Sequence, residues 1–150
     1  MRYQAILSGL IVAATLHVAS SHAAAPAGGN FVSHMTQMQY FTHKLGLAVT
    51  ARNRELEGYY VHEVEEIIEQ VSEVEEYKGI PVGQLIRDTL LPTFEYLEKT
   101  LQTGDAEAAD VAYDKLIEAC NACHKAAKHE FIRIERRTDN PYLQGFTPAE

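Results

Sequence analysis

Cys120-Asn121-Ala122-Cys123-His124 places two thiols three residues apart, with an imidazole directly after the second. This spacing is typical of the attachment site of a c-type haem. Each sulfur adds across one vinyl group of the porphyrin, and the neighbouring His124 then reaches the iron as an axial ligand. The pattern therefore predicts one haem c that is bound covalently through Cys120 and Cys123.

Two other uses of a Cys-x-x-Cys pair are open on the sequence alone. A dithiol redox pair usually lies in a βαβ setting, and no stretch of this chain has the periodicity of a strand. A structural zinc site needs four ligands. The chain has only these two cysteines, and His129 would be a poorly placed further ligand. The sequence therefore favours haem attachment over both.

The N-terminal segment has the features of an export signal. Met1-Arg2 gives a positive start, residues 5–19 are mainly apolar, and Ser21-His22-Ala23 offers small residues for a signal peptidase. We predict a signal peptide over 1–23, cleaved after Ala23, and one mature domain over 24–150 in the periplasm. The apolar run is short for a membrane span, so we expect none after cleavage. A retained N-terminal anchor is the alternative.

Length and charge narrow the class of protein. The chain has 150 residues and 46% hydrophobic residues, which suffices for one domain with a core. Its formal net charge of -8 argues against binding to nucleic acid or to anionic membranes, and is compatible with a basic partner. Because both cysteines lie in the motif, no disulfide framework is expected.

Apolar residues recur at helical spacing in four segments. We predict helices over 31–50, 53–77, 81–103 and 106–137, hence an all-α, antiparallel up-down-up-down four-helix bundle. The break near residue 52 lacks Gly and Pro, so one continuous helix is the alternative there.

Several single residues refine this prediction. Gly46 would permit the close approach of a neighbouring helix. Pro92 should kink the third helix, and Asp105 is a plausible N-cap of the fourth. We expect four tyrosines to lie in the core: Tyr59, Tyr60, Tyr96 and Tyr113. We expect the C-terminal tail to pack along the bundle through Tyr142, Leu143 and Phe146.

An export signal, four helices and the motif on the last helix together resemble the cytochrome c′ family. Ordinary small cytochromes c carry the motif near the N-terminus instead. The likeness covers residues 30–137 and implies a haem between the helices at one end of the bundle, with His124 as the proximal ligand.

The resemblance also implies features beside the haem. A basic residue one turn after the motif lines the proximal side, and Lys128 stands there. Ala127 stands where the family usually has an aromatic residue. Relatives often form homodimers through the first two helices, to which Leu47, Tyr59 or Val61 could contribute.

The residues opposite His124 decide what the iron can bind. Counting both helices outward from their shared end places His124 level with residue 33. Candidate distal residues are therefore Met38 and Met35, which lie on the inward row, and His34 if the register differs by one residue. Core packing is the simpler use of each methionine. His43, His62 and His129 are expected to lie away from the iron.

Two functions remain open. An apolar distal face would admit a diatomic gas such as NO or CO. A Met or His as sixth ligand would instead make a low-spin electron carrier, and the glutamates of the second helix could dock a basic redox partner protein. Peroxidase-like catalysis would need a distal acid–base group, for which only His34 could serve. We therefore expect no enzyme.

Overall fold

The computed structural model describes residues 27–149, with side chains described from residue 31 onward. Over this part of the chain the fold is all-α, as predicted, and its β-type pairing is a single isolated bridge, Tyr77 to Ile80. The signal peptide predicted over 1–23, with its cleavage site, lies outside the described residues. The helices are α1 (Ala27–Ala51), α2 (Arg54–Ser72), α3 (Val82–Leu85), the π-helical turn η1 (Ile86–Leu90), α4 (Leu91–Thr103) and α5 (Ala106–Ala126).

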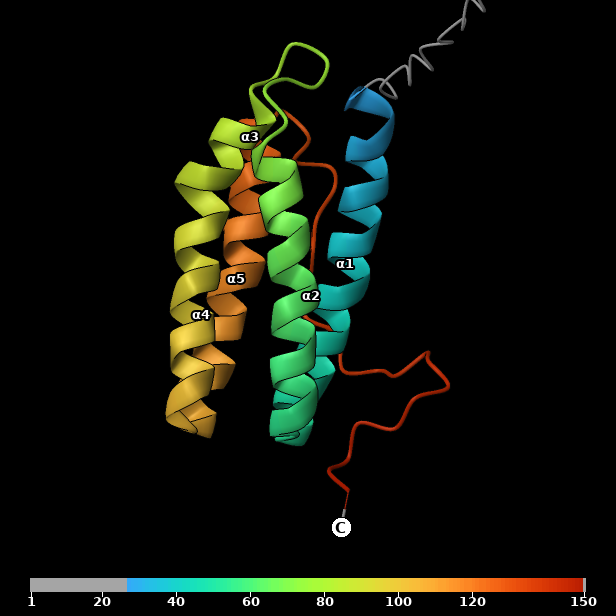
Figure 1. The fold of residues 1–150 in the computed structure, drawn as a ribbon, viewed down its shortest axis with the longest axis vertical. Coiled ribbons are helices and arrows are strands. Elements are labelled where there is room, and N and C mark those ends of the chain that lie inside the picture. The colour runs from blue at the N-terminus through green and yellow to red at the C-terminus, as the bar shows by residue number, and fades with distance from the viewer. Residues whose placement is uncertain (1–26, 150) are drawn as a thin grey trace, which may run out of the picture.

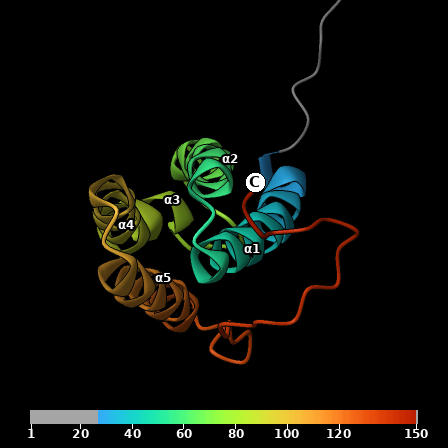
Figure 2. The same cartoon turned by 90° about the horizontal axis from the view of Figure 1, so that it is seen from below.

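The four longer helices lie side by side along the long axis of the molecule (Figure 1). Two-residue turns join α1 to α2 and α4 to α5, so the two members of each pair run in opposite directions. Further contacts join α1 to α5 and α2 to α4. Seen from below, the C-terminal segment runs outside α5 and α1 (Figure 2). None of the described helices is both long enough and apolar enough to span a membrane.

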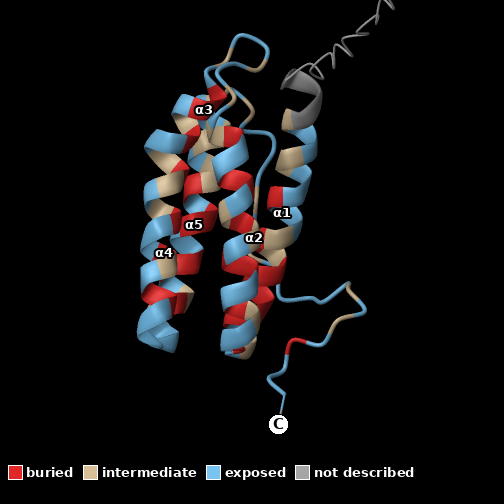
Figure 3. Cartoon of the chain, viewed as in Figure 1, coloured by how far each residue is buried: buried red, intermediate tan, exposed pale blue. Residues whose placement is uncertain are grey.

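Buried side chains lie on the inward sides of these helices (Figure 3). Tyr60 and Tyr113 belong to this core, as predicted, whereas Tyr59 and Tyr96 are exposed and the prediction for them is wrong. Tyr113 donates from its hydroxyl to the carbonyl oxygen of Thr42 at 2.9 Å. A Cβ on Gly46 would lie 2.5 Å from Cζ of Tyr113, so Gly46 does permit a close approach, here of α5 to α1.

Two of the three residues that the resemblance suggested for a homodimer surface are buried within this chain. Leu47 and Val61 are 6% and 8% exposed and pack in the core of this chain, which leaves Tyr59 as the exposed member. Helical periodicity alone did not separate the inward positions from their neighbours here, because both helices carry apolar residues on more than one side.

The break between α1 and α2 is confirmed, and the single continuous helix is wrong. Arg52 takes a left-handed conformation with φ of 58°. Its guanidinium donates to the carbonyl of Ala106 at 2.8 Å and to Asp110 at 2.6 Å. Asn53 then caps α2 by accepting from the backbone N–H of Leu56 at 3.2 Å. Long-range contacts of Arg52 thus take the place of a turn glycine.

Helix α2 ends at Ser72, earlier than the predicted Tyr77. Gly83, at the start of α3, donates from its N–H to the carbonyl of Val74 at 2.9 Å. A Cβ on Gly83 would lie 2.5 Å from the carbonyl oxygens of Ser72 and Val74. This backbone contact uses carbonyls at the end of α2, and the chain continues as a loop in which Tyr77 stacks on Phe31 at 4.9 Å between centroids.

The irregularity expected at Pro92 takes the form of η1, the π-helical turn just before it. Proline has no N–H to donate to a carbonyl four residues back. Leu91 donates instead to the carbonyl of Ile86, five residues back. The wider turn places Ile86 and Leu90 in the core.

Helix α5 begins as predicted and ends earlier. Asp105 accepts from the backbone N–H groups of Glu107 and Ala108, both at 3.0 Å, which confirms it as the N-cap. The helix ends at Ala126 and does not continue to residue 137. Lys128 takes a left-handed conformation with φ of 58°, and the chain turns back along α5.

The C-terminal segment is anchored by polar contacts as well as by apolar ones. Phe146 is buried and Tyr142 half-buried, as predicted, but Leu143 is fully exposed. Lys44 donates to Gln144 at 2.9 Å and lies over the ring of Tyr142 at 4.8 Å. Apolar residues alone therefore did not identify how the tail is held.

Candidate functional site

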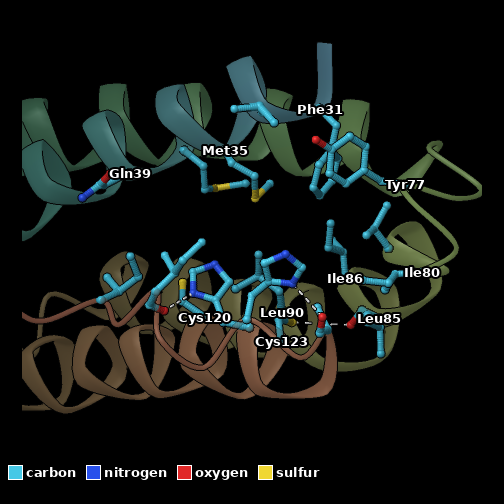
Figure 4. A pocket seen from close by; sticks show the side chains of 18 of the residues that line it. Phe31, Met35, Gln39, Tyr77, Ile80, Leu85, Ile86, Leu90, Cys120 and Cys123 are labelled. Carbon is cyan, nitrogen blue, oxygen red and sulfur yellow. Dashed lines mark hydrogen bonds between the residues drawn. The ribbon is translucent and has the colours of Figure 1, made fainter. Parts of the chain in front are cut away.

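A cavity of about 440 Å³ lies between α1 and α5, at the end of the molecule that carries the loop before α3. Its α1 wall includes Phe31, Met35 and Met38. Its α5 wall carries three residues of the sequence motif: Cys120, Cys123 and His124. Figure 4 shows Met35 projecting from α1 into the gap opposite Cys120 and Cys123. The sides are closed by the loop, α3, η1 and the C-terminal segment: Tyr77, Lys78, Ile80, Val82, Leu85, Ile86, Leu90, Ala127, His129, Ile132 and Ile134.

The two cysteines lie one turn apart on the cavity side of α5, and neither forms a disulfide. Burial, with a smaller contribution from Cys123, raises the pKa of the Cys120 thiol to about 12. Burial also raises the pKa of Cys123, against a hydrogen bond with Thr89. Thiols that act as redox nucleophiles have lowered pKa values. These two are protonated at neutral pH, which does not favour a dithiol redox pair.

His124 is held by a backbone carbonyl. Its Nδ1 lies 2.7 Å from the carbonyl oxygen of Ile132, which can only accept a hydrogen bond. Nδ1 therefore carries a proton, which in a neutral ring leaves the lone pair on Nε2. Metal-ligating histidines are usually fixed in this way, with the second ring nitrogen on a carbonyl or carboxylate.

His129 also lines the cavity, contrary to the prediction that it points away. The reason is the turn that ends α5. His129 donates from its N–H to the carbonyl of His124 at 2.7 Å, and Lys128 donates to that of Lys125 at 3.0 Å. This pair of bonds is a Schellman motif, which brings the residue after the left-handed position beside the residue five before it. His129 is thus placed next to His124. No glycine in the sequence marked this turn.

The α1 wall contains the two predicted methionines and lacks the histidine. Met38 is buried and Met35 half-buried, and both line the cavity. His34 is not among the lining residues. None of the described α1 residues that line the cavity carries a titratable group; besides the methionines they are Phe31, Val32, Thr36, Gln39 and Thr42.

Lys128 does not lie at the cavity, although the resemblance placed it there. Its side chain is exposed, and its backbone supplies the left-handed residue that ends α5. In a helix continuing past the motif, Lys128 would lie one turn above His124. The early end of α5 removes it from that place.

The remaining predicted histidines lie elsewhere. Nδ1 of His43 lies 3.0 Å from the hydroxyl of Tyr142. His62 is exposed on α2, 3.4 Å from Glu66. In the part of the chain that the structure describes, no group of three or more His, Cys, Asp or Glu side chains is arranged to hold a metal ion. Cys120, Cys123, His124 and His129 thus line one cavity without converging as zinc ligands would.

No family model, curated protein or solved structure matches this chain.

Proposed function

We propose that this chain is an exported monohaem c-type cytochrome of the cytochrome c′ type. In this proposal haem c is bound covalently to Cys120 and Cys123, His124 is the axial ligand, and the long helices form an up-down-up-down bundle around it. The observation that carries the proposal is the cavity. Both cysteines and His124, whose Nδ1 is bonded to the carbonyl of Ile132, line one wall of a single, largely apolar space. The periplasmic location rests on the sequence of residues 1–23.

The described residues fit such a group. The cavity volume of about 440 Å³ lies within the range of roughly 300–1,000 Å³ usual for ligand sites. The cysteines lie on the same wall as His124, as attachment next to an axial ligand requires. When bound, the haem supplies an iron that accepts a small ligand or transfers one electron. The chain's residues would tether it, orient it through His124 and exclude water with apolar walls.

A diatomic gas such as NO or CO is the ligand that the α1 wall supports best. Met35, Met38 and Phe31 give this wall an apolar character, and His34, the candidate if the register differed by one residue, does not line the cavity. An uncharged wall of this kind favours small neutral ligands over anions or water. Peroxidase-like turnover would need a distal acid–base group, and none of the described α1 residues that line the cavity is titratable, so we do not propose catalysis.

A low-spin electron carrier is the second candidate, and one observation supports it. Met35 projects into the cavity opposite the cysteines (Figure 4), and a thioether sulfur is a common axial ligand of c-type haem. Exposed glutamates on α2, among them Glu66 and Glu69, could then dock a basic redox partner protein.

Absorption spectra of the ferric and ferrous protein, with and without CO, test the proposal and separate the two candidates. The protein should be red when it is exported by a host that attaches c-type haem. A Soret band that shifts on adding CO supports the gas-binding function. A low-spin spectrum that is indifferent to CO, and that becomes sensitive to CO in Met35→Leu, supports the electron carrier. A colourless protein contradicts both.

A further inference from the structure

Asn121, within the motif, holds the returning C-terminal segment against α5. Its Nδ2 donates to the carbonyl oxygen of Ile134 at 2.8 Å, and its Oδ1 accepts from the N–H of Ile134, also at 2.8 Å. An asparagine amide presents a donor and an acceptor side by side. It therefore pairs with both backbone polar groups of one residue, as a neighbouring strand would. Both residues are half-buried.

This pairing fixes the residue two positions earlier, Ile132. The segment is tied before Ile132 by the turn at His129, whose carbonyl accepts from the N–H of Ile132 at 2.8 Å. It is tied after Ile132 by Asn121. The carbonyl oxygen of Ile132 is thereby held 2.7 Å from Nδ1 of His124.

The motif itself does not contain this acceptor. It comes from the backbone eight residues after His124 and cannot be supplied by the helix, whose carbonyls point along its own axis. A hydrogen bond from Nδ1 to a carbonyl fixes the tautomer and the ring orientation of a ligating histidine and raises its basicity. The Asn121 amide ties the segment on the C-terminal side of that carbonyl.

We infer that Asn121 is a positioning residue for the axial ligand: by pairing with Ile134 it holds the Ile132 carbonyl on His124. The inference rests on the proposed function, because it assigns His124 to the iron. It goes beyond the motif, in which the two residues between the cysteines are free to vary.

Asn121→Leu tests this role, since leucine keeps the size of the side chain and removes both hydrogen bonds. Asn140→Leu is a matched control. Asn140 makes the same pair of bonds within the C-terminal segment, from Nδ2 to the carbonyl of Gln144 at 2.8 Å and from the N–H of Tyr142 at 3.0 Å. It does not line the cavity.

The readouts are the iron–histidine stretching frequency of the ferrous protein, by resonance Raman spectroscopy, and the reduction potential. In Asn121→Leu a freed Ile132 carbonyl makes His124 less basic, so the frequency should fall and the potential should rise. Asn140→Leu should match the wild type in both. Asn121→Asp keeps the acceptor for the Ile134 N–H and loses the donor, so its frequency should fall by less; its added charge lowers the potential independently, so only the frequency is compared for this variant.

Red Asn121→Leu protein with the wild-type frequency and potential would overturn the inference and leave the proposed function standing. A wild-type protein without covalent haem would overturn both. If Asn121→Leu does not accumulate, Asn121→Asp decides by the frequency, and a wild-type frequency in that variant overturns the inference.

Discussion

The two long walls of the cavity differ in chemistry and in how they are held. The α5 wall carries both thiols and His124, and the hydrogen bonds of the returning segment fix that imidazole. The α1 wall carries methionines, a phenylalanine and a few uncharged polar groups. The α5 wall thus holds an imidazole in a fixed orientation, and the α1 wall faces it with mainly apolar side chains.

Removing the thiols should have the largest effect, because it removes the groups of the α5 wall that would bind haem covalently. We expect Cys120→Ser with Cys123→Ser to lose all covalently bound haem, since a serine hydroxyl does not add to the vinyl groups as a thiol does. Haem staining after denaturing electrophoresis measures this. Met35→Leu, on the α1 wall, is the matched variant and should stain like the wild type. Staining of the double serine variant would contradict the assignment.

A change in the close packing between α1 and α5 should have the next largest effect, on the free energy of unfolding. In Gly46→Ala the added Cβ would meet the Tyr113 ring, so α1 and α5 would be forced apart. Overpacking of this kind costs about 1–3 kcal/mol of the free energy of unfolding. Gly58→Ala is the control, since a Cβ there meets nothing within 4 Å. It should stabilise by roughly 0.5–1 kcal/mol, as alanine does in a helix interior.

Urea denaturation of the two alanine variants checks this prediction. Equal effects at both positions would show that the close packing of Gly46 on Tyr113 does not set the distance between the walls.

The turn that shapes the α5 wall should respond with a smaller change of the opposite sign. Lys128 is left-handed with φ of 58°, a conformation that costs a non-glycine residue about 1–2 kcal/mol. We expect Lys128→Gly to raise the free energy of unfolding by about 1 kcal/mol, within that range. Lys125→Gly, inside the helix, should lower it by a similar amount. Thermal denaturation compares them, and a destabilised Lys128→Gly would argue against the Schellman turn.

The smallest expected change in stability concerns Asp110 on α5, which forms an ion pair with Arg136 of the returning C-terminal segment. Burial raises the pKa of the Asp110 carboxyl, but hydrogen bonds and charge from Arg136 and Arg52 outweigh it and hold the pKa below its usual 3.8. Arg136 lies 2.5 Å from Asp110 and 3.0 Å from Asp114. A lowered pKa stabilises the folded state above about pH 3.8, and this contribution is lost as the pH falls through the folded-state value.

Asp110→Asn should therefore be less stable than the wild type at pH 6, by up to about 1 kcal/mol for such a partly exposed pair. The difference should shrink below pH 4. Urea denaturation across this range measures it, and a difference that is independent of pH would exclude the charge of Asp110 as its cause.

The sequence predicted those features that depend on local chemistry. The helical periodicity, the cap at Asp105 and the irregularity at Pro92 follow from contacts within a few residues, and all three are found. Counting the rise per residue along two antiparallel helices predicted Met35 and Met38 near the level of His124, and both line the same cavity as His124. That either of them faces a haem stays a prediction.

The features that were missed depend on contacts between distant segments. Lys128 and Arg52 adopt left-handed conformations without the usual glycine. The residues around them therefore did not indicate a left-handed turn at either position. The position at which α5 ends determines where His129, Lys128 and Ile134 lie. Beside this end, Asn121 and His124 are hydrogen-bonded to Ile134 and Ile132 of the returning segment. A single sequence does not show which asparagine will pair with which backbone.

The intact mass of the denatured, exported protein tests the central claim most directly. The account predicts a chain heavier than the mature polypeptide by one haem, with no thiol left to alkylate at Cys120 or Cys123. A mass equal to that of the polypeptide, with both thiols open to alkylation, would contradict it.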